Sequence, residues 1–352
     1  MSDLVRTAGR QGAVTIKYGP GGRASSSGLT VTVFGCTGFL GRYLVNQLSE
    51  HGSAVVTPWR AYEDDKRHLK PMGDLGQITS VKFGIYNHQQ LIDSVRNSDV
   101  VYNLVGREYA TKSFSLTAAN VDSARNIAHV CREEGVPALV HLSHLSSSAT
   151  SPSHYLRAKH QAEEAVRAEF PAATIVRTST MFGHEDRFLH QIGWLANWPM
   201  LPVVNEGTAI RRPVYVGDVA KGLANLASDA SAPGATYEFY GPKTYTYEEI
   251  IDLWIELTRK PISKVYPPTS LFKLYAKFVD AISPYPKIHP DVITRLTIDE
   301  VPQLAHLAST RTLADAGVTK PAVLEYAAIE YVRRYRKHDV YHLPGRIPAH
   351  EK

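Results

Sequence analysis

The chain has 352 residues, of which 43% are hydrophobic and 21% are charged, and its formal net charge is +5. These values are ordinary for a globular protein with a sizeable core, and no stretch approaches the ~20 consecutive apolar residues that span a bilayer. Because no stretch is long enough to span a bilayer, we expect a soluble or peripheral protein. The positive charge is mild and scattered, which argues against nucleic-acid binding.

Residues 1–28 form an N-terminal arm of small and basic residues. They contain a single acidic residue, Asp3, beside several arginines, glycines and serines. This composition resembles the remnant of a transit peptide or an extended arm, and a disordered terminus is the alternative.

A glycine-rich turn follows at residues 30–42. An apolar, β-branched run leads into Gly35, Gly38 and Gly41 and then into an amphipathic helix pattern. This order is typical of a dinucleotide-binding βαβ unit, in which a pyrophosphate lies on the exposed N–H groups at the helix N-terminus. The alternative is a tight turn without a ligand. We expect the nucleotide to contact Gly35, Thr37, Gly38, Phe39, Leu40, Gly41 and Arg42.

Strand and helix signals alternate as far as about residue 184. The predicted strands are 30–34, 54–57, 78–83, 99–105, 138–143 and 173–178, and the predicted helices are 39–51, 89–96, 120–134 and 155–169. Such alternation produces a parallel sheet with helices on both faces. The sequence therefore predicts an α/β protein with a Rossmann-type, doubly wound parallel sheet in residues 29–184. Residues 185–352 are expected to complete the sheet and to form a smaller mixed C-terminal cap or docking region.

The end of the second strand decides between NAD and NADP. NAD-binding proteins place an Asp or Glu there, about 20 residues after the glycines, to bind the ribose 2′-hydroxyl. This chain has Arg60 instead, directly after Trp59. A guanidinium would make charge-assisted hydrogen bonds to a 2′-phosphate, with Arg42 assisting, so NADP(H) is favoured. The alternative is that Arg60 is a solvent-exposed loop cation.

Tyr155 and Lys159 are spaced so that they share one face of a helix. In short-chain dehydrogenases such a lysine binds the nicotinamide ribose and lowers the tyrosine pKa, and the tyrosine exchanges a proton with the substrate while the cofactor moves a hydride. A serine that ends the preceding strand orients the substrate, and Ser143 occupies that place. A tyrosine and a lysine at this spacing also occur by chance on amphipathic helices. Their position after the glycine motif makes the prediction of a dehydrogenase site much stronger.

Further residues at strand ends complete the predicted cofactor site. Leu104, Val105 and Gly106 end the strand 99–105, where the chain passes the adenine ribose and the pyrophosphate. Asn120 begins the following helix, and Arg177 ends the strand after the tyrosine helix, where the backbone meets the nicotinamide. All five are predicted to bind the cofactor.

Beyond residue 184, two helices are predicted from their capping residues. Asp218 precedes the helix 219–228, which follows a short strand at 213–216, and Thr246 precedes the helix 247–259. A third helix, 270–282, carries an apolar stripe and two lysines that would suit lipid headgroups. It either packs on its own cap or docks a partner subunit or the membrane surface. The stripe comprises Leu271, Leu274, Tyr275, Phe278 and Ile282, and the lysines are Lys273 and Lys277.

The cysteines and histidines predict neither a disulfide framework nor a metal site. There are two cysteines, Cys36 in the glycine turn and Cys131 on a predicted helix, which indicates a reducing compartment. The 15 histidines are dispersed without the spacing of metal ligands.

Together these motifs resemble an atypical short-chain dehydrogenase/reductase. A closer resemblance, over roughly residues 17–330, is to the family of NADPH-binding accessory subunits of mitochondrial respiratory complex I. It rests on the segments 21–42, 153–159, 182–188, 213–219 and 282–286.

The resemblance implies a bound cofactor without turnover. In this family the fold holds NADPH as a structural cofactor, in a peripheral-arm subunit near the ubiquinone site on the matrix side of the mitochondrial inner membrane. The implied partners are other complex I subunits and not nucleic acid. Ser143, Tyr155 and Lys159 are all present, so the non-catalytic assignment rests on the resemblance and not on a missing residue.

Two alternatives stay open. One is a working NADP-dependent reductase or epimerase that acts on a nucleotide sugar or a small carbonyl compound. The other is a regulator without chemistry, whose affinity for a partner differs between NADP⁺ and NADPH.

Overall fold

The computed structural model describes residues 26–336 apart from 61, 112–113, 198–199, 261, 283–288 and 304–309, together with two short strands in the arm. These strands, β1 (Arg6–Ala8) and β2 (Val14–Ile16), pair antiparallel. The resemblance segments 21–25 and 283–286 lie outside the described residues.

The described chain forms two compact units. The first comprises the described residues up to 179 with those of 216–240 and 302–320, and the second comprises the described residues of 180–215, 241–301 and 321–336. Residues beyond 184 therefore contribute to both units.

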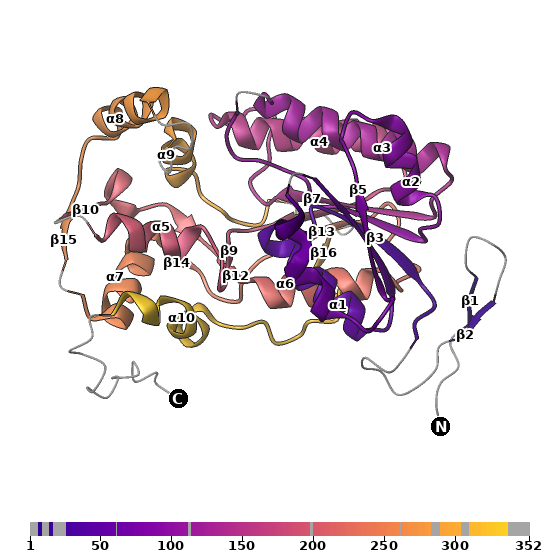
Figure 1. Cartoon of the computed structure of the whole chain (residues 1–352). Coiled ribbons are helices and arrows are strands. Elements are labelled where there is room, and N and C mark those ends of the chain that lie inside the picture. The colour runs from indigo at the N-terminus through magenta and orange to yellow at the C-terminus, as the bar shows by residue number, and fades with distance from the viewer. Residues whose placement is uncertain are drawn as a thin grey trace. The chain divides into compact units, whose positions relative to one another are not determined.

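An eight-stranded parallel sheet forms the first unit, in the order β16-β13-β8-β7-β6-β3-β4-β5 (Figure 1). Every neighbouring pair is parallel, and the chain reverses its direction of winding on either side of β3. The doubly wound sheet predicted from the sequence is thus confirmed, with two further strands added at one edge. The strands are β3 (Thr30–Phe34), β4 (Ala54–Trp59), β5 (Ile78–Lys82), β6 (Val100–Asn103), β7 (Ala138–His144), β8 (Thr174–Thr178), β13 (Thr236–Phe239) and β16 (Thr310–Thr312).

Helices cover both faces of this sheet. Helix α1 packs against α6 on one face, while α3 packs between α2 and α4 on the other (Figure 1). A hydrophobic core lies under the second group, where Ile127, Leu139 and Val166 are fully or almost fully buried. The helices are α1 (Phe39–Glu50), α2 (His88–Val95), α3 (Ser123–Glu133), α4 (His154–Glu169) and α6 (Val216–Leu226), and a 3₁₀ segment, η1 (Glu63–Met72), follows β4.

Two helix starts differ from the sequence prediction. The helix predicted from Asn120 begins with a π-helical turn, η2 (Ala118–Asp122), which continues into α3. Asp218 was predicted to cap a helix, and this is wrong, because α6 begins at Val216 and Asp218 lies within its first turn. Thr246 is confirmed as a cap, and it forms a reciprocal capping box with Glu249.

The second unit contains three two-stranded sheets and five helices around Trp254, which is almost fully buried. Strand β9 (Met181–Phe182) pairs with β12 (Val214–Tyr215), β10 (Met200–Pro202) with β15 (Ser263–Val265), and β11 (Ile210–Arg211) with β14 (Tyr245–Thr246). The helices are α5 (Phe188–Leu195), α7 (Tyr247–Thr258), α8 (Thr269–Ile282), α9 (Pro290–Leu296) and α10 (Leu324–Val332), with 3₁₀ turns η3 (Val204–Gly207) and η4 (Arg333–Tyr335). Within the described residues, no helix combines the length and the hydrophobicity needed to cross a membrane.

Candidate functional site

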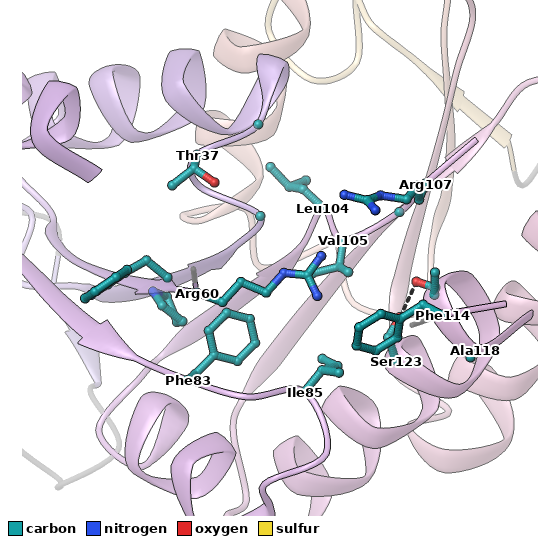
Figure 2. Close-up of a pocket in the computed structure, with 16 residues that line it drawn as sticks. Thr37, Arg60, Phe83, Ile85, Leu104, Val105, Arg107, Phe114, Ala118 and Ser123 are labelled. Atoms are coloured by element: carbon teal, nitrogen blue, oxygen red, sulfur yellow. Dashed lines mark hydrogen bonds between the residues drawn. The ribbon is translucent and has the colours of Figure 1, made fainter. Parts of the chain in front are cut away.

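A cavity of about 180 Å³ opens at the carboxyl ends of β3, β4, β5 and β6 (Figure 2). This is the switch point of the sheet, where open α/β folds bind their ligands. The cavity is smaller than the ~300 Å³ at the low end of ligand pockets. Its lining residues are Gly35, Thr37, Gly38, Pro58, Trp59, Arg60, Phe83, Ile85, Leu104, Val105, Gly106, Arg107, Phe114, Ala118, Ala119 and Ser123.

The glycine turn has no space for side chains at two positions. Gly35 has a φ of +84°, which favours glycine. A Cβ on Gly41 would overlap the carbonyl oxygen of Gly35 and come within 2.7 Å of the Cα of Cys36. The N–H of Gly38 donates to Gly35 O at 3.0 Å and closes the turn. Gly38 caps α1 without a side-chain hydrogen bond, and uncapped N–H groups at a helix N-terminus are a common binding site for anions.

Cys36 fastens this turn to the end of β4. Its Sγ donates to the carbonyl oxygen of Pro58 at 3.3 Å, and the side chain is fully buried. Burial raises the pKa of the thiol to about 12, so Cys36 stays neutral and packs as a small apolar residue. The side chain of Cys131 is likewise buried, and its sulfur is not part of a disulfide.

Arg60 follows β4, as predicted, and enters the cavity. Its guanidinium lies 5.5 Å from the ring centroid of Phe114, which in turn stacks on Tyr86 at 5.8 Å. Burial, and to a smaller extent the charge of Arg107, lower the pKa of Arg60. Two guanidinium groups therefore share one cavity, and among the described residues no Asp or Glu lines it.

The loop after β6 is held by Asn120, which belongs to the π-helical turn. Its Oδ1 accepts from the backbone N–H of Arg107 at 3.1 Å, and its Nδ2 donates to the carbonyl oxygens of Arg107 and Leu116 at 2.8 and 2.9 Å. Asn120 itself is buried. It positions Arg107, and π-helical turns of this kind are frequent at functional sites.

Tyr155 and Lys159 share one face of α4, where the Nζ of Lys159 lies 5.9 Å from the tyrosine ring centroid. This Nζ donates to the carbonyl oxygen of Leu142 at 3.2 Å, and a Cβ on Gly106 would lie only 2.9 Å from it. Burial lowers the pKa of Lys159 to about 8, against the opposing charges of Glu163 and Glu108. The lysine is therefore packed directly behind the cavity wall.

Glu163 lies one helical turn beyond Lys159. Its carboxylate is the centre of a buried network of hydrogen bonds that was not predicted from the sequence. Arg177 pairs with it through two nitrogens, with Nη2 at 2.7 Å from Oε2 and Nε at 3.1 Å from Oε1. Ser143 and Ser147 donate their hydroxyls to Oε1, Ser147 at 2.7 Å. The carboxylate is thus satisfied by a cation and two hydroxyls, as a buried charge requires.

The structure brings part of the predicted cofactor site together around the cavity. Seven of the predicted cofactor residues line the cavity: Gly35, Thr37, Gly38, Arg60, Leu104, Val105 and Gly106. Nine others, all described, lie outside its lining: Phe39, Leu40, Gly41 and Arg42 in α1, and Asn120, Ser143, Tyr155, Lys159 and Arg177 around α4 and the neighbouring strand ends. Their contact with a cofactor stays a prediction. Arg42 donates to the carbonyl oxygen of Thr37 at 3.4 Å and braces the turn.

Several lining residues were missed by the sequence reasoning. Phe83, Ile85 and Arg107 come directly after β5 and β6. Their position at the carboxyl edge of a parallel sheet is a signal that could have found them. Phe114 lies in an irregular loop, and no sequence pattern places it in the cavity.

Comparisons with known proteins identify relatives of this chain. The model of the NAD dependent epimerase/dehydratase family matches residues 31–238. The mitochondrial NADH dehydrogenase (ubiquinone) 1 alpha subcomplex subunit 9 of Mus musculus is 38% identical, over 91% of this chain and 84% of the relative. The mitochondrial NADH-ubiquinone oxidoreductase 40 kDa subunit of Neurospora crassa is also 38% identical, over 94% and 85%.

A solved structure shares the fold. The triphenylmethane reductase of Citrobacter sp., complexed with NADP(H), has a TM-score of 0.66 at 15% identity, covering 87% of this chain and 99% of the reductase. The family model spans more than half of the chain, and the two mitochondrial relatives match most of it. The chain belongs to the NAD dependent epimerase/dehydratase family and, within it, to the family of the subunit 9 and 40 kDa subunit proteins of NADH-ubiquinone oxidoreductase.

Proposed function

We propose that this protein is a non-catalytic accessory subunit of mitochondrial complex I that binds NADPH as a structural cofactor. The observation that carries the cofactor assignment is the cavity at the switch point, with Arg60 and Arg107 as its charged residues and no carboxylate among the described lining residues. A carboxylate there would bind a ribose 2′-hydroxyl, whereas guanidinium groups favour a phosphate.

The residues present fit a dinucleotide. Glycines at positions 35 and 41 fit the close-packed turn of such a site, because a Cβ at either position would collide with or strain the turn. Lys159, behind Gly106, would hold the nicotinamide ribose. When bound, NADPH supplies a hydride in related enzymes. Here its proposed role is to order the glycine turn and α4, and a ligand present at 1,000 times its dissociation constant stabilises the folded state by about 4 kcal/mol.

The proposed partners are other subunits of the peripheral arm, near the ubiquinone site on the matrix side of the inner membrane. The names of the mitochondrial relatives support the complex I part of this assignment. Helix α8 would add a contact with anionic lipid, because Leu271, Leu274 and Phe278 are 62%, 65% and 64% exposed on one face. Its only acidic residue, Asp280, lies 3.2 Å from His289, so α8 carries two lysines against one carboxylate.

An active reductase or epimerase is the second candidate, favoured by the shared face of Tyr155 and Lys159. The experiment that separates the two follows the absorbance of reduced nicotinamide while the purified, NADPH-loaded protein is mixed with a panel of carbonyl compounds and nucleotide sugars. We expect no oxidation of NADPH above that of the free cofactor. Turnover that Tyr155→Phe abolishes would overturn the non-catalytic assignment.

A further inference from the structure

Arg107 enters the cavity from the opposite side to Arg60. In Figure 2 the guanidinium of Arg107 lies beside Leu104, while Arg60 comes from the other side and extends past Phe83 toward Val105. The two side chains come from different strand ends, β6 and β4.

The backbone of Arg107 is fixed by Asn120, and the loop that carries it starts beside the glycine turn. Asn120 binds both its N–H and its carbonyl oxygen. The start of the same loop lies against the turn, because the N–H of Leu104 donates to Phe34 O at 3.0 Å and a Cβ on Gly35 would lie 3.0 Å from the carbonyl carbon of Leu104. The loop that carries Arg107 therefore begins at the glycine turn that precedes α1, whereas Arg60 stands at the strand end where the adenosine ribose is recognised.

Two guanidinium groups without a lining carboxylate repel each other, and an anion placed between or beside them relieves the repulsion. NADPH carries two separate anionic groups, the pyrophosphate and the 2′-phosphate. We propose that Arg107 binds the pyrophosphate of the dinucleotide while Arg60 binds the 2′-phosphate. This assignment rests on the proposed function, and it makes Arg107 a binding residue for any dinucleotide and Arg60 the residue that selects NADP(H).

The test is the dissociation constant of NADPH and of NADH, measured by titration calorimetry on the full chain. Arg107→Gln is expected to weaken both nucleotides by the same factor, about tenfold or more, as the loss of a charge-assisted contact predicts. Arg60→Gln is expected to weaken NADPH by a similar factor and leave NADH unchanged. Arg107→Lys, which keeps the charge, should recover part of the affinity for both.

Arg125→Gln is the matched control, because Arg125 is half exposed on α3 and pairs only with the surface residue Asp122 among the ion pairs described. It should change neither constant, and far-ultraviolet circular dichroism checks that each variant folds. Weakening of NADPH alone by Arg107→Gln, or of neither nucleotide, overturns the assignment of Arg107. Absence of NADPH binding to the unaltered chain overturns the proposed function itself.

Discussion

The hydroxyl of Ser143 donates a hydrogen bond to the carboxylate of Glu163, on the face of α4 that also carries Lys159. In the register of the sheet Ser143 stands directly beside Arg177, which binds the same carboxylate. The hydroxyl of the serine that would orient a substrate is therefore already hydrogen-bonded to a buried carboxylate of the protein. This arrangement supports a site that holds a cofactor without turning it over.

Replacing Ser143 by alanine should lower the free energy of unfolding by about 1 kcal/mol, because Glu163 loses one of its donors in a buried environment. Urea denaturation of the two proteins measures the difference. An unchanged midpoint and slope would show that the serine does not serve the carboxylate.

Glu163→Ala should cost much more, about 3–5 kcal/mol, because it leaves Arg177 buried without its anion. The neighbouring Glu164→Ala is the control, since Glu164 is 67% exposed and contacts His160 at 3.7 Å. That change should stay within about 0.5 kcal/mol. If the two substitutions lowered the free energy of unfolding equally, the proposed stabilising role of the Glu163 network would be contradicted.

Lys159 should make stability depend on pH. Its pKa is about 8 in the folded protein, lowered mainly by burial from the ordinary lysine value of 10.5 that applies to the unfolded chain. Between these values the unfolded state binds more protons, so stability rises as the pH is raised from about 8 to 10.5, by up to about 3 kcal/mol. Below pH 8 both states are protonated and the cost of burying the charge is fully present. Lys159→Met should abolish the rise in unfolding free energy across this range, and an identical rise in both proteins would contradict the assignment.

Much of the fold could be predicted from the sequence, because its signals are local. The β-branched run before Gly35, the buried run that forms β6 and the helical spacing of Tyr155 and Lys159 each indicate an element without knowledge of its neighbours. Thr246 was found in the same way, from one residue and the helix after it.

The parts that escaped prediction depend on tertiary pairing. Ser143 and Arg177 become neighbours only because β7 and β8 are adjacent in the sheet, and Glu163 reaches them from a helix. Asn120, in a π-helical turn, accepts a hydrogen bond from the backbone N–H of Arg107, which lies thirteen positions earlier in the chain. No periodic pattern reports such contacts.

Helix α8 provides a prediction for the membrane. Leu274→Ser with Phe278→Ser should reduce binding of the protein to vesicles containing anionic phospholipid by at least tenfold, because each exposed side chain would bury apolar area worth about 1.5–3 kcal/mol. Vesicle co-flotation measures this. Leu75→Ser is the control, since Leu75 is fully exposed outside α8. Equal binding of all three proteins would rule out α8 as the lipid contact.

The most direct test of the central claim is the nucleotide content of the native chain, isolated gently from mitochondrial membranes and analysed by mass spectrometry. We predict that it co-purifies with a large respiratory assembly and carries one NADP(H) per chain, and that the Arg60→Gln form carries markedly less. A chain that assembles normally with no bound nucleotide would contradict the account, as would one that is found only outside the assembly.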